Sequence, residues 1–599
     1  MTSNSAMLDK VTEEVKSGKL LASAAENLKI WLTEPCYSQY VPAIVEHLEQ
    51  EKFEQLNDVF WQAVPFGTGG RRGKMYPIGP GAINERTIGE SVQGLADYVK
   101  ETKLAADPNA TLVAGIAYDT RHRSREFAEL AAGIMVAAGY TVFFFDGIRS
   151  TPELSFLVRE KKCDCGVMVT ASHNPPSDNA VKVYSETGGQ FCPPHDEGVI
   201  AKMKATTDIR SSSFDETLAA GKVIYCQDEI DASFIDAVAK QGRGTPTNLR
   251  LVYSPLHGVG GTVVPAVLEK IGVPKENFFP FKPHWQPDPD FTNVPGHVSN
   301  PERPEVFDLI FPYADEVDAD LILATDPDAD RLGVGSRANS QPNAPWVLLT
   351  GNHVGVLLTD YLLAVMQEEG TLKDASYIVS TIVTTELAGK VAEKYGAIYS
   401  NNHHVGFKWI GEAIDELGPE NFVLGMEESY GYLVGTHARD KDAAVASVVL
   451  TCCASYWKLR GKTLAQRLEE IHDEFGYYED NQFSVYLEGA SGMEKMATLM
   501  SNFQKNPPTE IAGCKVAKVR DYTTAEEFTP GGTRTSFDAP RGDLVIFLLD
   551  SPGCRVAVRP SGTEPKIKFY LFVRSEDEKS AKELYAKLEA ELRKVAADA

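Results

Sequence analysis

The spacing of apolar residues along the chain predicts a helical lead-in followed by strand–helix units. Residues 1–60 carry apolar side chains at helical spacing, such as Leu20, Leu28 and Trp31, and contain no strand-like apolar run. From residue 111 onward, short apolar runs alternate with amphipathic stretches, which is the pattern of a parallel sheet with crossover helices. In this first unit we expect strands at 112–118, 141–145 and 166–169 and helices at 124–138 and 151–161.

The same alternation returns twice before the pattern changes. The second unit has expected strands at 249–254 and 320–325 and an expected helix at 261–271. The third unit has expected strands at 377–381 and 422–424 and expected helices at 352–366, 386–395 and 442–458. In the tail, expected strands at 543–549, 554–559 and 566–573 precede a charged helix at 576–596, which predicts a smaller α+β domain.

We therefore predict an α/β fold with three similar α/β units, built on mixed sheets around a central cleft, plus a smaller C-terminal α+β domain. Polar, turn-rich stretches near 242, 345 and 478 set the expected boundaries. The expected segments are a helical N-terminal segment (1–60), domain I (61–242), domain II (243–345), domain III (346–478) and domain IV (479–599).

The charge balance narrows the classes of ligand. The 599 residues include 59 Lys and Arg against 84 Asp and Glu, which gives a formal net charge of −25. Such an acidic chain disfavours nonspecific binding to nucleic acid or anionic lipid, so an anionic small molecule must be met by local basic loops. We expect no nucleic-acid partner and no membrane partner.

The cysteines and the apolar stretches indicate a cytoplasmic protein. Nine cysteines lack the paired spacing of a zinc site or of a small disulfide scaffold. The first 15 residues lack the apolar region of a secretory signal, and the uncharged stretch 443–457 is shorter than the about 18 residues of a membrane helix. We expect reduced thiols and a cytoplasmic location.

The first candidate for chemistry is Thr-Ala-Ser-His-Asn-Pro-Pro at 170–176, directly after an expected strand. Ligands of parallel sheets bind beyond the carboxyl ends of the strands, so Ser172, with His173 beside it, is placed to act as a nucleophile or to carry a covalent group. The alternative is an ordinary turn in which Ser and Asn satisfy backbone amides and the prolines end the strand. The flanking residues do not match the Gly-x-Ser-x-Gly elbow of hydrolases.

Three aspartates at alternate positions, Asp326, Asp328 and Asp330, follow the expected strand at 320–325. Alternate side chains of an extended loop can converge on one side, and their hard oxygens suit Mg²⁺, which keeps coordination sites open for a phosphate oxygen. A calcium-hand loop needs Gly and Glu where Arg331 and Arg337 stand, so that reading fails. A solvated acidic turn is the remaining alternative.

Two further loops carry weaker signals. The stretch from Arg559 to Lys568 offers a planar guanidinium, two hydroxyls and glycine amides that suit a phosphate, or it is an ordinary hairpin. Glu427 and Ser429 lie two residues apart after an expected strand and could bind vicinal hydroxyls, although an ordinary loop explains them equally well. The Gly-rich stretch 66–73 is ambiguous in the same way. In combination, the loops favour four domains around one polyol phosphate.

The ordered loops TASHNP, DPDADR, EESYG and RPSGTEPKIK resemble the four signature loops of the α-D-phosphohexomutase superfamily, the phosphoglucomutases and phosphomannomutases, over residues 66 to 570. FGTGGRRG, SPLHGVGG and VGFKWIG resemble the branch that also includes phosphopentomutases and sugar-bisphosphate synthases. The resemblance implies a mutase that interconverts 1-phospho and 6-phospho forms of a hexose through a phosphoserine and a sugar bisphosphate. Glucose is the expected sugar and mannose the second.

The resemblance also implies a role for individual residues. The implied catalytic residues are Ser172, as the phosphoserine, His173, Arg72 and Lys441. The implied Mg²⁺ ligands are Ser172, through a phosphoserine oxygen, Asp326, Asp328 and Asp330. The implied substrate-binding residues are Arg331, Gly406, Lys408, Glu427, Ser429, Arg559, Ser561, Gly562, Thr563 and Lys568. The implied activator is glucose 1,6-bisphosphate, and the implied partner is a small sugar phosphate.

Two departures from the family pattern leave choices open. Arg71 and Arg72 stand where many members have Leu-Arg, so either arginine could be the functional one, and Met426 replaces a frequent glycine and changes the expected pocket shape. The alternative enzymes are a phosphopentomutase, a glucose-1,6-bisphosphate synthase and a metal-dependent phosphatase. The non-enzyme alternative is a sugar-phosphate sensor.

Overall fold

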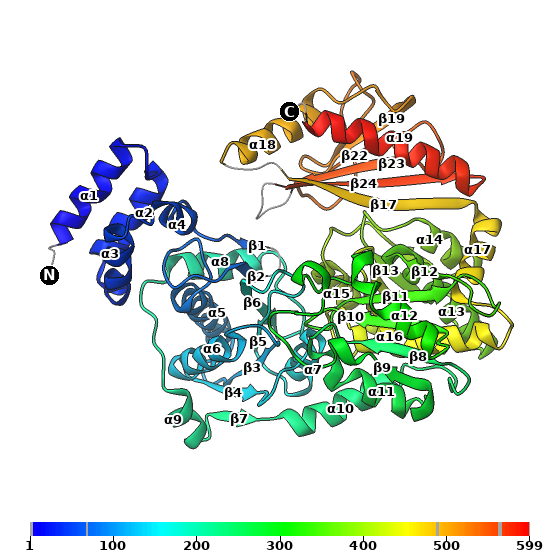
Figure 1. The fold of residues 1–599 in the computed structure, drawn as a ribbon, viewed down its shortest axis with the longest axis horizontal. Coiled ribbons are helices and arrows are strands. Elements are labelled where there is room, and N and C mark those ends of the chain that lie inside the picture. Colours follow the sequence, from blue (N-terminus) through cyan, green and yellow to red (C-terminus); the bar gives the residue numbers. More distant parts are fainter. Residues whose placement is uncertain (1–3, 68–69, 487–489, 561–565, 598–599) are drawn as a thin grey trace.

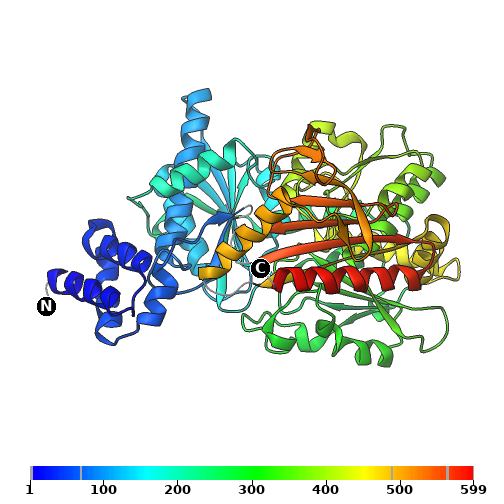
Figure 2. The same cartoon turned by 90° about the horizontal axis from the view of Figure 1, so that it is seen from above.

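The computed structural model describes residues 4–67, 70–486, 490–560 and 566–597 (Figure 1). The described chain begins with the helices α1 (Asn4–Lys16), α2 (Ala22–Thr33), α3 (Val41–Glu49) and α4 (Phe53–Phe60). These helices bury Leu28, Trp31, Ile44 and Phe60 in a small apolar core that also includes Ile78 and Ala82 of the stretch that follows. Both views place them at one end of the molecule, beyond the first sheet (Figures 1 and 2).

The first α/β unit contains a seven-stranded mixed sheet with the strand order β1-β2-β6-β5-β3-β4-β7. Its strands are β1 (Phe66–Gly67), β2 (Gly70–Lys74), β3 (Leu112–Tyr118), β4 (Tyr140–Phe144), β5 (Cys165–Val169), β6 (Asp178–Ser185) and β7 (Val223–Tyr225). Strands β5, β3, β4 and β7 are parallel neighbours, whereas β6 pairs antiparallel with β5, and β2 with β6. The sheet therefore carries β2, with its two arginines, beside the segment that follows β5.

Helices cover both faces of this sheet because its inner strands are apolar on both sides. Helices α5 (Glu85–Ala106) and α6 (Ser124–Ala138) pack on one face with α8 (His195–Ala205), and α7 (Thr151–Glu160) and α10 (Gln227–Ala239) pack on the other. A capping box starts α7: Ser150 accepts a hydrogen bond from the Glu153 amide, and Glu153 accepts one from the Ser150 amide.

The second and third units repeat the plan with smaller sheets. The second has the order β12-β11-β10-β8-β9, and its strands are β8 (Leu251–Ser254), β9 (Phe278–Pro280), β10 (Leu321–Thr325), β11 (Leu332–Arg337) and β12 (Trp346–Leu349). The third has the order β14-β13-β15-β16, and its strands are β13 (Tyr377–Ser380), β14 (Ile398–Ser400), β15 (Phe422–Glu427) and β16 (Gly431–Leu433). The accompanying helices are α11 (Val264–Lys270), α12 (Ile310–Glu316), α13 (Gly351–Glu368), α14 (Leu387–Lys394), α15 (Phe407–Leu417), α16 (Ala443–Lys458) and α17 (Leu464–Phe475).

One continuous apolar core joins these three units. It contains Leu154 of the first unit, Leu323 of the second, and Leu357 and Val445 of the third, all fully buried. Because a shared core couples the units through many contacts, they form one base beneath the cleft.

The fourth unit is an antiparallel sheet covered by helices on one face. Its strands are β17 (Tyr477–Tyr486), β18 (Glu510–Ile511), β19 (Cys514–Asp521), β20 (Glu526–Phe528), β21 (Thr535–Ser536), β22 (Val545–Leu549), β23 (Arg555–Pro560) and β24 (Lys566–Ser575), and its helices are α18 (Ala490–Lys505) and α19 (Glu578–Ala597). The other face meets the third unit in a smaller apolar cluster that includes Val383 and Tyr570. Figure 1 shows this unit lying across the base.

The predicted fold class is confirmed, since three α/β units with mixed sheets accompany a β-rich C-terminal unit. The sequence pattern did not predict β6 and β12, because antiparallel strands added to a parallel sheet carry no strand–helix alternation of their own. It also did not predict β17, whose polar first residues lie at the expected domain boundary near 478. In the described part of the chain, no helix is long and apolar enough to cross a membrane.

Candidate active site

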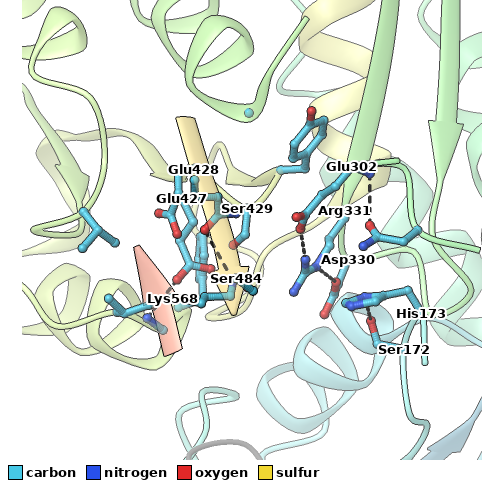
Figure 3. Close-up of a pocket in the computed structure, with 18 of the residues that line it drawn as sticks. Ser172, His173, Glu302, Asp330, Arg331, Glu427, Glu428, Ser429, Ser484 and Lys568 are labelled. Carbon is cyan, nitrogen blue, oxygen red and sulfur yellow. Dashed lines mark hydrogen bonds and ion pairs between the residues drawn. The ribbon is translucent and has the colours of Figure 1, made fainter. Parts of the chain in front are cut away.

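A cleft of about 1060 Å³ lies where the four units meet. Among its lining residues are Arg72 and Ser172 of the first unit, Arg331 of the second, Glu427 of the third and Lys568 of the fourth. Figure 3 shows Ser172 and His173 at one side of the cleft, beside Asp330 and Arg331, and Glu427, Ser429 and Lys568 at the other. The cleft thus brings together loops that are far apart in sequence.

Ser172 lies just beyond the carboxyl end of β5 and reaches the second unit. Its Oγ donates a hydrogen bond of 2.7 Å to Asp326 Oδ2 and lies 3.1 Å from His173 Nδ1. The side chain is 2% exposed, and the backbone has a left-handed φ of 53°. A non-glycine residue adopts such a backbone only when its surroundings hold it there, at a cost of roughly 1–3 kcal/mol.

Arg121, which follows β3, holds the Ser172 loop from behind. Its guanidinium donates to the carbonyl oxygens of Ser172 (3.2 Å from Nε), Asn174, Pro175 (2.8 Å) and Asp178 (3.1 Å). The side chain is buried. A planar guanidinium with five donors is suited to grip several carbonyl oxygens at once.

The amide side of the same loop is held by Thr170. Thr170 Oγ1 accepts from the Ser172 amide at 2.8 Å and donates to the buried carboxylate of Asp119 at 2.6 Å. Asp119 also lies 3.5 Å from Arg121 Nε, so it balances the buried guanidinium. The amide and the carbonyl of Ser172 are therefore both held by hydrogen bonds, which explains how the left-handed backbone persists.

The three aspartates of the loop between β10 and β11 form a compact buried group. One oxygen from each of Asp326, Asp328 and Asp330 lies within 4.8 Å of the others. Burial and the two neighbouring carboxylates raise the pKa of Asp326 well above its usual value. Three carboxylates at this separation repel one another, so the group favours a nearby cation.

The aspartates fit a divalent metal ion. Asp328 Oδ1 and Asp330 Oδ1 are buried and have no hydrogen-bond partner among the described residues, although such oxygens are normally satisfied. Asp326 Oδ2 contacts Ser172 Oγ, so a fourth oxygen is at hand. An all-oxygen set with few carboxylates is the donor set that Mg²⁺ prefers.

Two lysines from different units balance the acidic group. Lys182 of β6 donates from Nζ to Asp328 Oδ2 at 2.7 Å, and Lys441 Nζ lies 2.9 Å from Asp330 Oδ2. Burial opposes the charge of Lys441, but Asp330 and nearby carboxylates outweigh it and raise its pKa. Lys441 therefore stays cationic beside the aspartates. Lys182 forms ion pairs with Asp328 and Asp330.

The two consecutive arginines of β2 point in different directions. Arg72 lines the cleft and donates to Asn174 Oδ1 at 3.2 Å, whereas Arg71 is buried and bound to Glu90 Oε2 at 2.9 Å. Successive side chains of a strand face opposite sides of the sheet, which explains the difference. Of the two candidates, the structure therefore places Arg72 at the cleft.

His173 and Arg331 lie together at the same end. Arg331 forms an ion pair with Glu302 and lies beside Asp330 (Figure 3). Burial, together with the charges of Arg331 and Arg72, lowers the pKa of His173 well below its usual value. The imidazole is therefore neutral near pH 7 and can exchange hydrogen bonds with Ser172.

Glu427, the last residue of β15, and Ser429, two residues later, both line the cleft on the side opposite Ser172 (Figure 3). Glu427 is buried and accepts a hydrogen bond of 2.9 Å from the Gly406 amide, so the two predicted loops meet. Gly406 has a φ of 122°, a conformation that favours glycine. Glu428 also lines the cleft, where burial and the neighbouring Glu427 raise its pKa to about 7.

The fourth unit supplies a basic wall. Arg559 and Lys568 line the cleft, and Lys568 Nζ lies 3.4 Å from Gln482 Oε1 of β17. The predicted residues Ser561, Gly562 and Thr563 lie outside the described residues. Lys408 is buried and bound to Asp196 at 2.9 Å, and it is not among the cleft-lining residues of the described chain, so its substrate role stays a prediction.

Sequence reasoning missed Arg121 and Glu302. Arg121 stands in Asp-Thr-Arg-His-Arg-Ser, directly after β3, so its position at a strand end was a usable signal. Glu302 stands in an irregular stretch between β9 and β10, where apolar periodicity gives no guide. The cleft also includes Tyr486 and Ser484 of β17, a strand that the pattern did not predict.

The fold and the site describe a protein whose cleft brings basic side chains, which suit an anionic ligand, together with a buried group of carboxylates that fits a cation. Comparison with known families is consistent with this description. The family models described as phosphoglucomutase/phosphomannomutase, alpha/beta/alpha domains I, II and III, match residues 63–210, 232–339 and 350–475.

Full-length relatives agree with the family models. A phosphoglucomutase of Staphylococcus aureus (strain MRSA252) is 35% identical over 89% of this chain and 94% of its own length. A phosphoglucomutase of Staphylococcus haemolyticus (strain JCSC1435) is 35% identical over 86% of this chain and 90% of its own. The chain therefore belongs to the phosphoglucomutase/phosphomannomutase family, and it is a phosphohexomutase, an intramolecular phosphotransferase of the isomerase class.

Solved structures share the fold. The exocytosis-sensitive phosphoprotein pp63/parafusin of Paramecium, in an open form, aligns with a TM-score of 0.62 at 17% identity, over 89% of this chain and 94% of that one. A phosphoglucomutase/phosphomannomutase family protein of Burkholderia thailandensis aligns with a TM-score of 0.61 at 16% identity, over 88% and 97%. The architecture is thus shared across low sequence identity.

The hydrogen bonds from Arg121 to the Ser172 loop, here called the Arg121 clamp, give a first prediction. Arg121→Lys keeps the charge but removes the fork of donors, so the Ser172 loop loses contacts and mutase turnover should fall roughly tenfold or more. Arg123→Lys, an exposed substitution two residues away, is the matched control and should keep its turnover. Steady-state rates, with thermal melting of both variants, make the measurement. Equal turnover in the two variants would show that the clamp is not needed.

Proposed function

We propose that the protein interconverts the 1-phospho and 6-phospho forms of a hexose, with glucose as the preferred sugar and mannose as the second. In this proposal a phosphoserine at Ser172 and a bound sugar bisphosphate carry the phosphoryl group. The observation that supports it is the 2.7 Å contact between Ser172 Oγ and Asp326 Oδ2, at one end of a cleft whose other wall carries Arg559 and Lys568.

The proposed reaction uses the two ends of the cleft in turn. Phospho-Ser172 gives its phosphoryl group to the free hydroxyl of the bound sugar monophosphate, so the serine O–P bond breaks and a sugar O–P bond forms. The hydroxyl loses its proton and the serine oxygen gains one. The bisphosphate then reorients, and its other phosphoryl group returns to Ser172, which leaves the isomer.

The residues at the Ser172 end balance the charge of this transfer. A phosphoserine carries about −1.5 to −2 charges, and it would add to the three aspartates. Lys182, Lys441, Arg72 and Arg331 supply the opposing charge from three different units. When bound by Asp326, Asp328, Asp330 and an oxygen of Ser172, Mg²⁺ would polarise the phosphoryl oxygens.

The remaining walls would orient the sugar. Glu427 and Ser429 are placed to accept and donate hydrogen bonds to sugar hydroxyls, and Arg559 and Lys568 to hold the phosphate that is not reacting. Either phosphate of the sugar bisphosphate must bind at that wall in turn. The wall should therefore recognise the charge and shape of a phosphate group and not a single orientation of the sugar. The proposed domains I to IV, with boundaries near 242, 345 and 478, would each contribute one of these tasks.

The carrier role of Ser172 gives a second prediction. Ser172→Ala should abolish turnover of glucose 1-phosphate while sugar-phosphate binding stays within about twofold, because the cleft walls remain. Intact-mass spectrometry should find one phosphate on the native protein, discharged by substrate, and none on the variant. Ser177→Ala, on the exposed part of the same loop, is the matched control. Unchanged turnover in Ser172→Ala would remove the phosphoserine from the account.

The metal ligands give a third prediction. Asp328→Asn should weaken Mg²⁺ binding at least tenfold in a calorimetric titration, because it removes one of three charged ligands. Asp308→Asn, an exposed carboxylate of the same unit, should bind Mg²⁺ like the native protein. Equal affinity in the two variants, or full activity in the presence of a chelator, would show that these buried carboxylates are balanced by Lys182 and Lys441 and do not bind Mg²⁺.

A substrate panel separates the remaining alternatives. Glucose, mannose and pentose 1-phosphates, each assayed with and without a trace of glucose 1,6-bisphosphate, would rank kcat/KM and test the activator. Net formation of the bisphosphate from a second donor would favour a synthase, and release of inorganic phosphate would favour a phosphatase.

A further inference from the structure

We infer that the N-terminal helical segment, residues 4–60, is a brace that positions Arg72 for phosphoryl transfer. The inference rests on the proposed role of Arg72 beside phospho-Ser172. It assigns a task to a segment that contributes none of the cleft-lining residues in the described chain.

The segment docks on the stretch that directly follows β2. Ile78 and Ala82 are 1% exposed and belong to the same apolar cluster as Trp31 and Phe60 of the helices. The Gly81 amide donates to the Val59 carbonyl at 2.8 Å. The helices thus hold residues 78–82, only a few positions beyond Arg72.

Close backbone approach makes this docking specific. A Cβ atom at Gly79, whose φ is 95°, would lie 2.4 Å from the Val59 carbonyl oxygen, and one at Gly81 would lie 2.8 Å from it. His47 of α3 also forms a 2.6 Å hydrogen bond between its Nε2 atom and the Tyr76 hydroxyl. Only glycine permits this packing, so residues 78–82 and the helices fit in one arrangement.

A series of side-chain contacts connects the N-terminal helical segment to β2. The Tyr37 ring lies 4.6 Å from the guanidinium carbon of Arg86, and Arg86 Nε donates to Glu90 Oε1 at 2.8 Å. Glu90 Oε2 then accepts from Arg71 Nη1 at 2.9 Å. Arg71 and Arg86 are both buried, so Glu90 is the carboxylate that these two guanidinium groups share.

Fixing Arg71 fixes the direction of Arg72. Neighbouring side chains of a strand point to opposite faces, so the anchored Arg71 leaves Arg72 facing the cleft. There Arg72 donates to Asn174 of the Ser172 loop at 3.2 Å, and the Met75 amide donates to the Ser177 carbonyl at 2.8 Å. Arg72 of β2 therefore contacts the Ser172 loop directly, and β2 is linked to the brace through Glu90 and Arg86 and through the stretch 76–82 that follows it.

The test uses full-length variants in a double-mutant cycle. Tyr37→Leu removes the aromatic face from Arg86, and Glu90→Gln removes the shared charge; each is made in the native and in the Arg72→Ala background. Ile30→Ala, an exposed apolar residue of the same segment, is the control. Turnover of glucose 1-phosphate, KM and thermal melting are measured for each protein.

We expect each brace variant to lower kcat roughly fivefold to tenfold, with KM for glucose 1-phosphate changed less than about twofold. In the Arg72→Ala background the same changes should lower the residual kcat less than about twofold, since Arg72 is already absent. Ile30→Ala should match the native protein. This dependence on Arg72 is a readout that general loss of stability would not produce.

Two results would overturn the inference: native kcat in Tyr37→Leu and Glu90→Gln, or an equal fold loss in both backgrounds. If Glu90→Gln does not fold, the Tyr37→Leu pair decides alone. Native turnover in Arg72→Ala would instead refute the proposed role of Arg72 and the inference with it. The Ser172→Ala result is independent of the brace, so failure of the proposed function is distinguishable.

Discussion

The contact between Ser172 and Asp326 is the constraint on which the site depends, because it joins the first unit to the second at one oxygen. Ser172 contacts Asp326 from a left-handed backbone, and Arg121 and Thr170 hold the carbonyl and the amide of that residue. The continuous core beneath the first three units keeps the serine and the aspartates in register. Strain at the loop is therefore balanced by buried hydrogen bonds and by packing far from it.

Charge explains why so acidic a protein concentrates cations at this place. The chain has a formal net charge of −25, yet two lysines and two arginines surround Ser172 and the three aspartates. Each cation comes from a different strand or loop, so the balance exists only in the folded protein. The fourth unit meets the base through a smaller apolar cluster and carries its own basic wall. A phosphorylated ligand would thus be held between a fixed base and a separately attached wall.

The sequence predicted much of this because strand ends and alternate carboxylates are local features. Asp326, Asp328 and Asp330 follow a strand, and Ser172 follows another, so both groups were placed at the edge where parallel sheets bind ligands.

Other features depend on tertiary structure and could not be predicted from local pattern. The choice between Arg71 and Arg72 needed the register of β2 against β6, and the contact of Lys182 with Asp328 needed a strand, β6, that breaks the strand–helix alternation. Lys408 forms an ion pair with Asp196, a residue far away in the sequence, and only the tertiary fold brings these two side chains together.

The central claim is that a phosphate on Ser172 shares one cation with the aspartate loop. It is tested most directly by ³¹P nuclear magnetic resonance of the phosphorylated protein, with Mn²⁺ in place of Mg²⁺. The account predicts that stoichiometric Mn²⁺ broadens the phosphoserine signal strongly in the native protein and that Asp328→Asn restores much of its sharpness. A phosphoserine signal that stays sharp in the native protein when Mn²⁺ is bound would contradict it.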